Sequence, residues 1–414
     1  MAEDRAANPT SHDTRTPLPA VMVLTALASV GTAVIWNGIA FVAKHDYGFN
    51  KRQTLLMYLL IGVVYVVGAL STGPLTRKLK GTVSSRGLLA VILIIQSAVC
   101  ITPILFDGQW VLWMVAGVNI LLAAFFWPTV ESYTTAGRHG DEMRRAIGWF
   151  NLIWMAAVAG TMLSIAPLIE HGARLAIVGL GGASALGVVT LRWFRPSPGA
   201  HDEGRRQASV GAEYRRLLHS ARVLLPLSYV LMAAMSPLLP YLFQRLQLDV
   251  FWETPTAATW MTMRVAAVGL MWHFGFWHGR WGTLLLGGLA MTGGFALVVL
   301  GPNVAMMLLG FASFGAGLGI VYYAALYYAM SVGGAQIDAG GKHEALIGTG
   351  NAIGPAAGLI GITFARGAPG DELQMAEGVA VVTVVCVITL LGAVAAFGPY
   401  LKARRARNGD GAGS

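Results

Sequence analysis

One arginine stands where a charge is costly. Arg264 falls deep inside an apolar stretch, residues 255–278, with no acidic residue expected at comparable depth. A charged side chain at the centre of a bilayer costs about 2.5–3.5 kcal/mol on insertion scales, so such residues usually serve function. Because its planar guanidinium binds anions through parallel hydrogen bonds, we expect Arg264 to bind an acidic or strongly polar group of a ligand. The alternative is a structural arginine that bonds backbone carbonyls or water between helices.

Two other titratable residues lie near the ends of apolar stretches. Glu131 is expected to pair with a nearby cation, the candidates being Arg77, Lys78, Arg138 and Arg144. The alternative roles for Glu131 are to carry a proton or to be a passive, solvated charge. His273, within the sequence MWHFGFWH, also suits proton transfer because histidine titrates near neutral pH. A buried, hydrogen-bonded histidine is the alternative there.

Amides and aromatic residues supply further candidates. Asn37 and Asn119 are expected to face a pocket, and Tyr322 and Tyr323 to offer a ligand stacking surfaces and hydroxyl groups. For both kinds of residue the alternative is helix packing, since polar side chains often join helices in membranes.

The sequence contains no recognisable catalytic motif. The sequence lacks an HExxH pair, a nucleotide-binding P-loop and a Gly-x-Ser-x-Gly turn. Cys100 and Cys386 have no metal-ligand spacing. We therefore expect no catalytic residues, no metal and no cofactor, and no ATP hydrolysis on this chain.

The composition places these residues in a membrane. Of the 414 residues, 55% are hydrophobic and 12% are charged, whereas a soluble domain is about 25% charged. A bilayer-spanning helix needs about 20 apolar residues. Twelve spans are predicted, at residues 18–43, 53–74, 86–106, 109–133, 146–169, 173–194, 222–244, 255–278, 282–300, 303–331, 345–366 and 375–400.

The positive charge has an uneven distribution over the predicted loops. Of 29 Lys and Arg residues, 22 fall in the two tails and the even-numbered loops, and six in the odd-numbered loops. Positive charge marks the cytoplasmic side. We expect both termini and the central loop to be cytoplasmic. This placement explains the net charge of +9 without a nucleic-acid partner.

An internal repeat divides the chain. Ala146–Ala157 (AIGWFNLIWMAA) and Leu346–Ala357 (LIGTGNAIGPAA) are identical at six of twelve positions, where unrelated sequence would give about one. The predicted domains are a six-helix half at 1–194, a linker at 195–220 and a second six-helix half at 221–414. Six spans per half make the two repeats parallel, as in many secondary transporters.

Three local motifs resemble those of the major facilitator superfamily. The loop after the second span reads Gly73–Gly81 (GPLTRKLKG), with Arg77 where the family has an acidic residue. Glu131 and Arg138 form a Glu-x6-Arg motif after the fourth span, and the eleventh contains Gly350–Gly358 (GNAIGPAAG). The resemblance implies an all-α polytopic fold of twelve transmembrane helices.

The resemblance also implies a function and a setting. We expect a secondary active transporter that moves a small solute by alternating access, coupled to protons or another ion, as a monomer in the plasma (inner) membrane. Arg264 favours an anionic or polyol-like substrate. Efflux of amphipathic compounds and a membrane receptor without transport activity are the alternatives.

The family resemblance and the internal repeat together suggest gating residues. Glu131, Arg138, Arg77 and Lys78 are expected to brace an inner gate. Asn151 and Asn351, at equivalent places of the repeat, are expected near the inner mouth. Gly354 and Pro355 are expected to interrupt a helix, either as a gating kink or for packing.

Overall fold

The computed structural model describes residues 15–79, 81–198, 211–332, 337–365 and 373–410. Within those ranges the regular structure is entirely helical. The elements are α1 Leu18–Gly31, the π-helix η1 Thr32–Gly38, α2 Ile39–His45, α3 Lys51–Leu79, α4 Ser85–Val99, α5 Thr102–Leu105, α6 Gln109–Thr135, α7 Gly140–Ser164, α8 Ala166–Gly172, α9 Arg174–Thr190, η2 Leu191–Trp193, α10 Ala212–Met235, η3 Ser236–Leu238, α11 Leu239–Arg245, α12 Val250–His273, α13 Trp281–Leu300, α14 Val304–Val332, α15 Ile337–Phe364 and α16 Leu373–Asp410.

The helices confirm the predicted all-α membrane fold. Across the described ranges, eleven helical segments are long and apolar enough to cross a membrane. The remaining long helix, α12, carries Glu253, Arg264 and His273, which make it more polar. Several helices extend past the predicted spans, α10 and α16 among them. α10 begins at Ala212, inside the segment expected to be linker, and α16 continues to Asp410. Residues 199–210 of that linker lie outside the described part of the chain.

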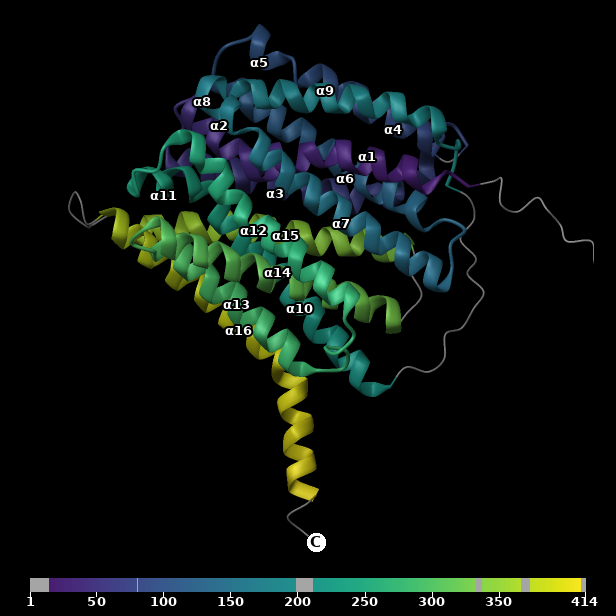
Figure 1. The fold of residues 1–414 in the computed structure, drawn as a ribbon, viewed down its shortest axis with the longest axis vertical. Helices are drawn as coiled ribbons and strands as arrows, with labels where there is room; N and C mark the ends of the chain where they lie inside the picture. The colour runs from purple at the N-terminus through teal and green to yellow at the C-terminus, as the bar shows by residue number, and fades with distance from the viewer. Residues whose placement is uncertain (1–14, 80, 199–210, 333–336, 366–372, 411–414) are drawn as a thin grey trace, which may run out of the picture.

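The helices form two neighbouring bundles. Figure 1 shows α1–α9, from purple to teal, on one side and α10–α16, from teal to yellow, on the other. One end of the molecule, called the α11 end below, carries the short helices α2, α5, α8 and α11. The opposite end, where α9 finishes and α10 begins, is called the linker end.

Two helix pairs make the most extensive contacts between the bundles, and the internal repeat lies in both. α7 packs against α12, and α15 packs against α3. A Cβ on Gly148 would lie 2.8 Å from Trp272 Cε2, and one on Gly348 would lie 2.9 Å from Val66 Cγ2. These glycines occupy matched positions in the repeat. The repeat therefore places a small residue where each bundle approaches the other.

The predicted interruption at Gly354 and Pro355 is wrong. α15 is one continuous helix that contains both residues. A Cβ on Gly354 would lie 2.5 Å from the carbonyl oxygen of Val230 in α10, so the glycine permits close packing of these two helices.

Polar contacts fasten the bundles together at the α11 end. His45 Nε2 lies 2.8 Å from Glu253 Oε2, and Lys51 Nζ lies 2.5 Å from Glu377 Oε2. Lys44 Nζ donates a hydrogen bond to the carbonyl oxygen of Pro240 at 2.6 Å. These contacts connect α2 with the start of α12 and with Pro240 of α11, and they connect α3 with the start of α16. They close this end of the interface between the bundles.

Gly62 of α3 provides a test of this packing. A Cβ there would lie 2.6 Å from the carbonyl oxygen of Asn351 and 2.7 Å from the amide nitrogen of Ala352. Since backbone atoms cannot rotate away, we expect Gly62→Ala to destabilise the protein by about 1–3 kcal/mol. The measurement is the melting temperature in detergent. Gly160→Ala, whose Cβ meets no atom within 4 Å, is the control and is expected to melt at or above the wild-type temperature. Equal melting of the two variants would contradict the close approach of α3 and α15.

Candidate functional site

A cavity of about 100 Å³ lies between the two bundles. Each bundle contributes four elements to its wall: η1, α3, α6 and α7 from one, and α10, α12, α14 and α15 from the other. The lining residues are Thr32, Trp36, Asn37, Tyr65, Trp127, Glu131, Phe150, Trp154, Tyr229, Met232, Trp260, Met261, Arg264, Tyr322, Glu344, Ile347 and Asn351. Most of the wall is aromatic or aliphatic, and a few polar groups converge on it.

Arg264 is the cation of this cavity and is only 1% exposed. Its guanidinium carbon lies 4.6 Å from the ring centre of Tyr322 and 5.0 Å from that of Trp154. Nη2 donates a hydrogen bond of 3.3 Å to the Tyr229 hydroxyl. Among the described residues no carboxylate forms an ion pair with Arg264, and its buried Nε has no hydrogen-bond partner. The π faces attract the cation without neutralising it.

Two carboxylates line the same cavity, so the expectation of no acidic residue at this depth is wrong. Glu131 comes from α6 and Glu344 from α15. The Tyr65 hydroxyl donates a hydrogen bond to Glu344. Sequence analysis missed Glu344 because the predicted span began at residue 345, immediately after it. The helix itself begins at Ile337 and carries Glu344 on its second turn.

Glu131 does not meet its expected partners in this structure. Arg138 instead donates to the carbonyl oxygens of Tyr133 and Thr134, at 2.9 and 3.0 Å, and so caps the end of α6. Arg144 pairs with Asp141. Arg77 and Lys78 are exposed near the end of α3. The inner-gate role of these residues stays a prediction.

Asn37 and Asn351 both line the cavity, and each has a side-chain oxygen without a partner. Asn37 belongs to η1, where a π-helical turn carries both Trp36 and Asn37 to the wall. Its Nδ2 donates to the carbonyl oxygen of Thr32 at 3.0 Å, while Oδ1 is unbonded. Asn351 Oδ1 is also buried and unbonded in the described structure. Such groups are rare in proteins and point to a missing partner.

Tyr322 lines the cavity as expected, and its hydroxyl donates to Asn151 Oδ1 at 2.7 Å. Asn151 also accepts a hydrogen bond of 3.1 Å from Trp154 Nε1. Asn151 thus lies behind the wall and holds two of the aromatic residues that surround Arg264.

Three predicted site residues lie elsewhere. Asn119 bonds the carbonyl oxygen of Val115 within the first bundle, at 2.9 Å. Tyr323 packs against Trp277, with ring centres 5.9 Å apart. Tyr323 is turned about 100° from Tyr322 around α14 and does not line the cavity. His273 is exposed at the end of α12, which also excludes the alternative of a buried histidine.

Sequence reasoning also missed Tyr65, Tyr229 and Trp154. Aromatic residues are common in apolar spans, and no motif distinguishes these three. Their role emerges only from the helix contacts that place them around Arg264 and Glu344.

Three solved structures of transporters share the fold. The nucleoside transporter NupG has a TM-score of 0.65 and 12% identity, with 92% of this chain and 97% of that chain covered. A bacterial homologue of the human lysosomal transporter Spinster, inward-facing and unoccupied, has a TM-score of 0.65 and 15% identity, with 94% and 96% covered. A bacterial homologue of the human drug peptide transporters PepT1 and PepT2 has a TM-score of 0.67 and 12% identity, with 94% and 98% covered. At these identities the likeness concerns the fold alone.

The sequence itself gives the family. No curated protein matches the chain in sequence. Residues 21–359, most of the chain, match the sequence profile of the Major Facilitator Superfamily. With the helical fold and the three transporter structures, this shows that the chain belongs to the Major Facilitator Superfamily and is a membrane transporter rather than an enzyme.

Proposed function

We propose that the protein is a secondary active transporter of a small organic anion, which binds between the bundles at Arg264. The observation that carries this proposal is the buried Nε of Arg264, which has no partner among the described residues. A buried cation with no carboxylate in direct contact is costly, and an anionic substrate that pairs with it would lower that cost. The guanidinium fork suits a carboxylate.

The remaining polar groups narrow the substrate further. The unbonded oxygens of Asn37 and Asn351 accept hydrogen bonds, so the substrate carries O–H or N–H groups beside its anionic group. A small hydroxylated or amino acid has both. The cavity volume of about 100 Å³ corresponds to about three water molecules, below the usual 300–1,000 Å³ of ligand sites. A small solute therefore fits best, and larger ones require the bundles to separate.

Alternating access would use the interface between the bundles. The α11 end is closed by the His45–Glu253 and Lys51–Glu377 pairs, which rocking of one bundle against the other would break. We propose that the linker end faces the cytoplasm, together with both termini, and the excess of Lys and Arg in the predicted loops at that end supports this orientation. We propose a monomer in the plasma (inner) membrane.

Coupling to protons is proposed to use Glu131 and Glu344. Two ionised carboxylates in one low-dielectric cavity repel each other, and binding of a proton by one removes that repulsion. His273 is exposed outside the cavity and takes no part in this scheme.

Arg264→Gln separates a binding role from a structural one. We expect this variant, without ligand, to melt no lower than wild type, because it removes a buried charge that lacks a carboxylate partner. Small carboxylates and their amides, such as lactate with lactamide and gluconate with gluconamide, are then compared by thermal shift. At least one carboxylate should stabilise wild type more than its amide, and Arg264→Gln should weaken that binding about 10- to 100-fold.

Arg222→Gln is the matched control, because Arg222 is exposed on α10 outside the cavity. It should keep the preference for the carboxylate. A lower melting temperature of ligand-free Arg264→Gln, together with equal binding of acids and amides by wild type, would assign Arg264 a structural role.

Glu131→Gln and Glu344→Gln test the coupling. In proteoliposomes, an imposed pH gradient should drive accumulation of the radiolabelled carboxylate chosen from the thermal-shift panel. We expect at least one variant to lose this accumulation and to keep exchange across the membrane at equal pH, because exchange needs no net proton movement. Glu170→Gln, on the exposed side of α8, is the control and should keep both activities.

Three outcomes would speak against this scheme. Full pH-driven accumulation by both variants would remove the two carboxylates from coupling. Gradient-driven export of amphipathic compounds would favour the efflux alternative. Saturable binding without flux under any gradient would favour a receptor.

A further inference from the structure

A second cavity lies at the linker end of the first bundle, apart from the central one. Its volume is about 590 Å³. The segment before α1, the start of α4, the α6–α7 turn, α7 and the chain around η2 supply its wall. The lining residues are Arg15, Thr16, Pro17, Arg86, Arg138, Glu142, Arg192, Trp193, Phe194, Arg195 and Pro196.

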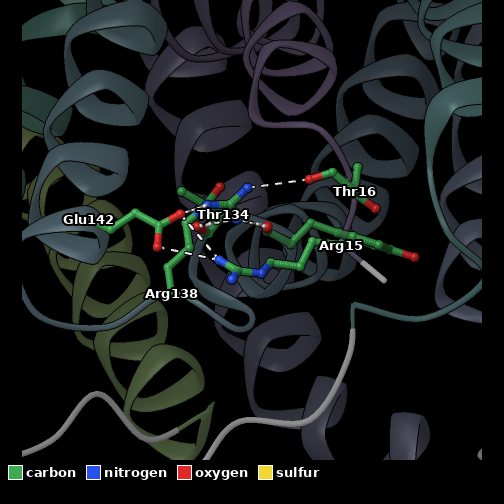
Figure 2. A network of polar contacts seen from close by, with 6 residues as sticks. Arg15, Thr16, Thr134, Arg138 and Glu142 are labelled. Atoms are coloured by element: carbon green, nitrogen blue, oxygen red, sulfur yellow. Dashed lines mark hydrogen bonds and ion pairs between the residues drawn. The ribbon is translucent and has the colours of Figure 1, made fainter. Parts of the chain in front are cut away.

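The cavity carries a large excess of positive charge. Five arginines face one glutamate, which leaves a net charge of +4. Arg15 Nη1 lies 3.2 Å from Glu142 Oε1, and Arg138 Nε lies 3.8 Å from the same oxygen (Figure 2). Glu142 therefore serves two of the arginines and cannot offset the charge of the others.

Arg138 forms the fixed back of the cavity and is 5% exposed. It donates to the carbonyl oxygens of Tyr133, Thr134 and Thr16, which ties the chain before α1 to the end of α6 (Figure 2). Burial lowers the pKa of Arg138 below its usual value, and the neighbouring Glu142 carboxylate offsets part of this decrease. These bonds hold the wall in place without a ligand.

Arg86 and Arg192 differ from Arg138 because both are exposed. Arg86 Nη1 donates to the carbonyl oxygen of Phe194 at 3.2 Å. The Arg192 guanidinium carbon lies 3.8 Å from the ring centre of Trp193. Each guanidinium has five N–H donors, so these contacts leave most of the donors open to an anion.

The cavity adjoins the end of a helical segment that is long and apolar enough to span a membrane. Trp193 is the last residue of the membrane-spanning segment Arg174–Trp193 and is 48% exposed. Tryptophan is enriched at the membrane–water interface. Toward the membrane centre, α4 and α9 pack together and expose aliphatic side chains, including Val91, Ile94, Leu186 and Val189. A polar site thus opens beside a surface suited to acyl chains.

We propose that this cavity binds the phosphate of an anionic phospholipid headgroup, with the acyl chains along α4 and α9. Arginine binds phosphate through bidentate, charge-assisted hydrogen bonds. Basic pockets beside transmembrane helices on the cytoplasmic side bind anionic headgroups by the same chemistry. The site is separate from the transport cavity, so the proposal does not depend on the substrate.

The test measures lipid binding by the full-length, delipidated protein. Melting temperature is followed as dioleoylphosphatidylglycerol, dioleoylphosphatidylcholine or inorganic phosphate is titrated into detergent. We expect the anionic lipid to stabilise wild type well beyond the zwitterionic lipid, with an effect that falls as salt rises. The double variant Arg86→Gln/Arg192→Gln should bind the anionic lipid at least about tenfold more weakly.

A second double variant, Arg215→Gln/Arg222→Gln, removes two arginines of α10 that do not line the cavity. It is expected to bind the anionic lipid as wild type does. An equal loss in both double variants would reduce the effect to general surface charge and overturn the site. Inorganic phosphate at the same concentrations could instead stabilise wild type and fail to stabilise Arg86→Gln/Arg192→Gln. That result would assign the cavity to a soluble anion and overturn its assignment to a lipid. Equal stabilisation of wild type by the anionic and the zwitterionic lipid would also overturn the assignment of the cavity to an anionic lipid.

Discussion

Arg264 is 1% exposed between two helix bundles, and no carboxylate of the described residues pairs with its guanidinium. In such a place a charge is tolerated only with compensation. The rings of Trp154 and Tyr322 and the hydroxyl of Tyr229 supply part of it. Nε has no hydrogen-bond partner among the described residues, which supports the proposal that an anionic substrate binds there.

The elements that form the cavity also form the contact between the bundles. α15 carries Glu344 and Asn351 on the cavity wall and Gly348 against α3. α12 carries Arg264 and places Trp272 against Gly148 of α7. A shift of either helix pair would therefore change the distances between Arg264, the carboxylates and the amides. The proposed binding and rocking would therefore be coupled, because both would involve the same helices.

Much of the fold follows from the sequence, since apolar length and charge placement are strong constraints in a membrane. Arg264, Asn37 and Tyr322, three of the predicted substrate-binding residues, line the cavity, and their roles in binding stay predictions. The errors in the predicted site arise because hydropathy does not give exact helix ends or side-chain packing. The predicted span began one residue after Glu344 and so excluded it, although the helix begins at Ile337. Which of Tyr322 and Tyr323 faces the cavity depends on how α14 packs against its neighbours. No motif or hydropathy pattern in the sequence predicts the π-helical turn at Asn37.

The central claim is that Arg264 holds the anionic group of the substrate. An experimental structure of the protein with a bound carboxylate tests it most directly. The account predicts a carboxylate oxygen within about 2.7–2.9 Å of Arg264 Nε, and a hydroxyl or amino group of the ligand on the oxygens of Asn37 or Asn351. A carboxylate bound elsewhere, with Arg264 Nε still unpartnered, would contradict it.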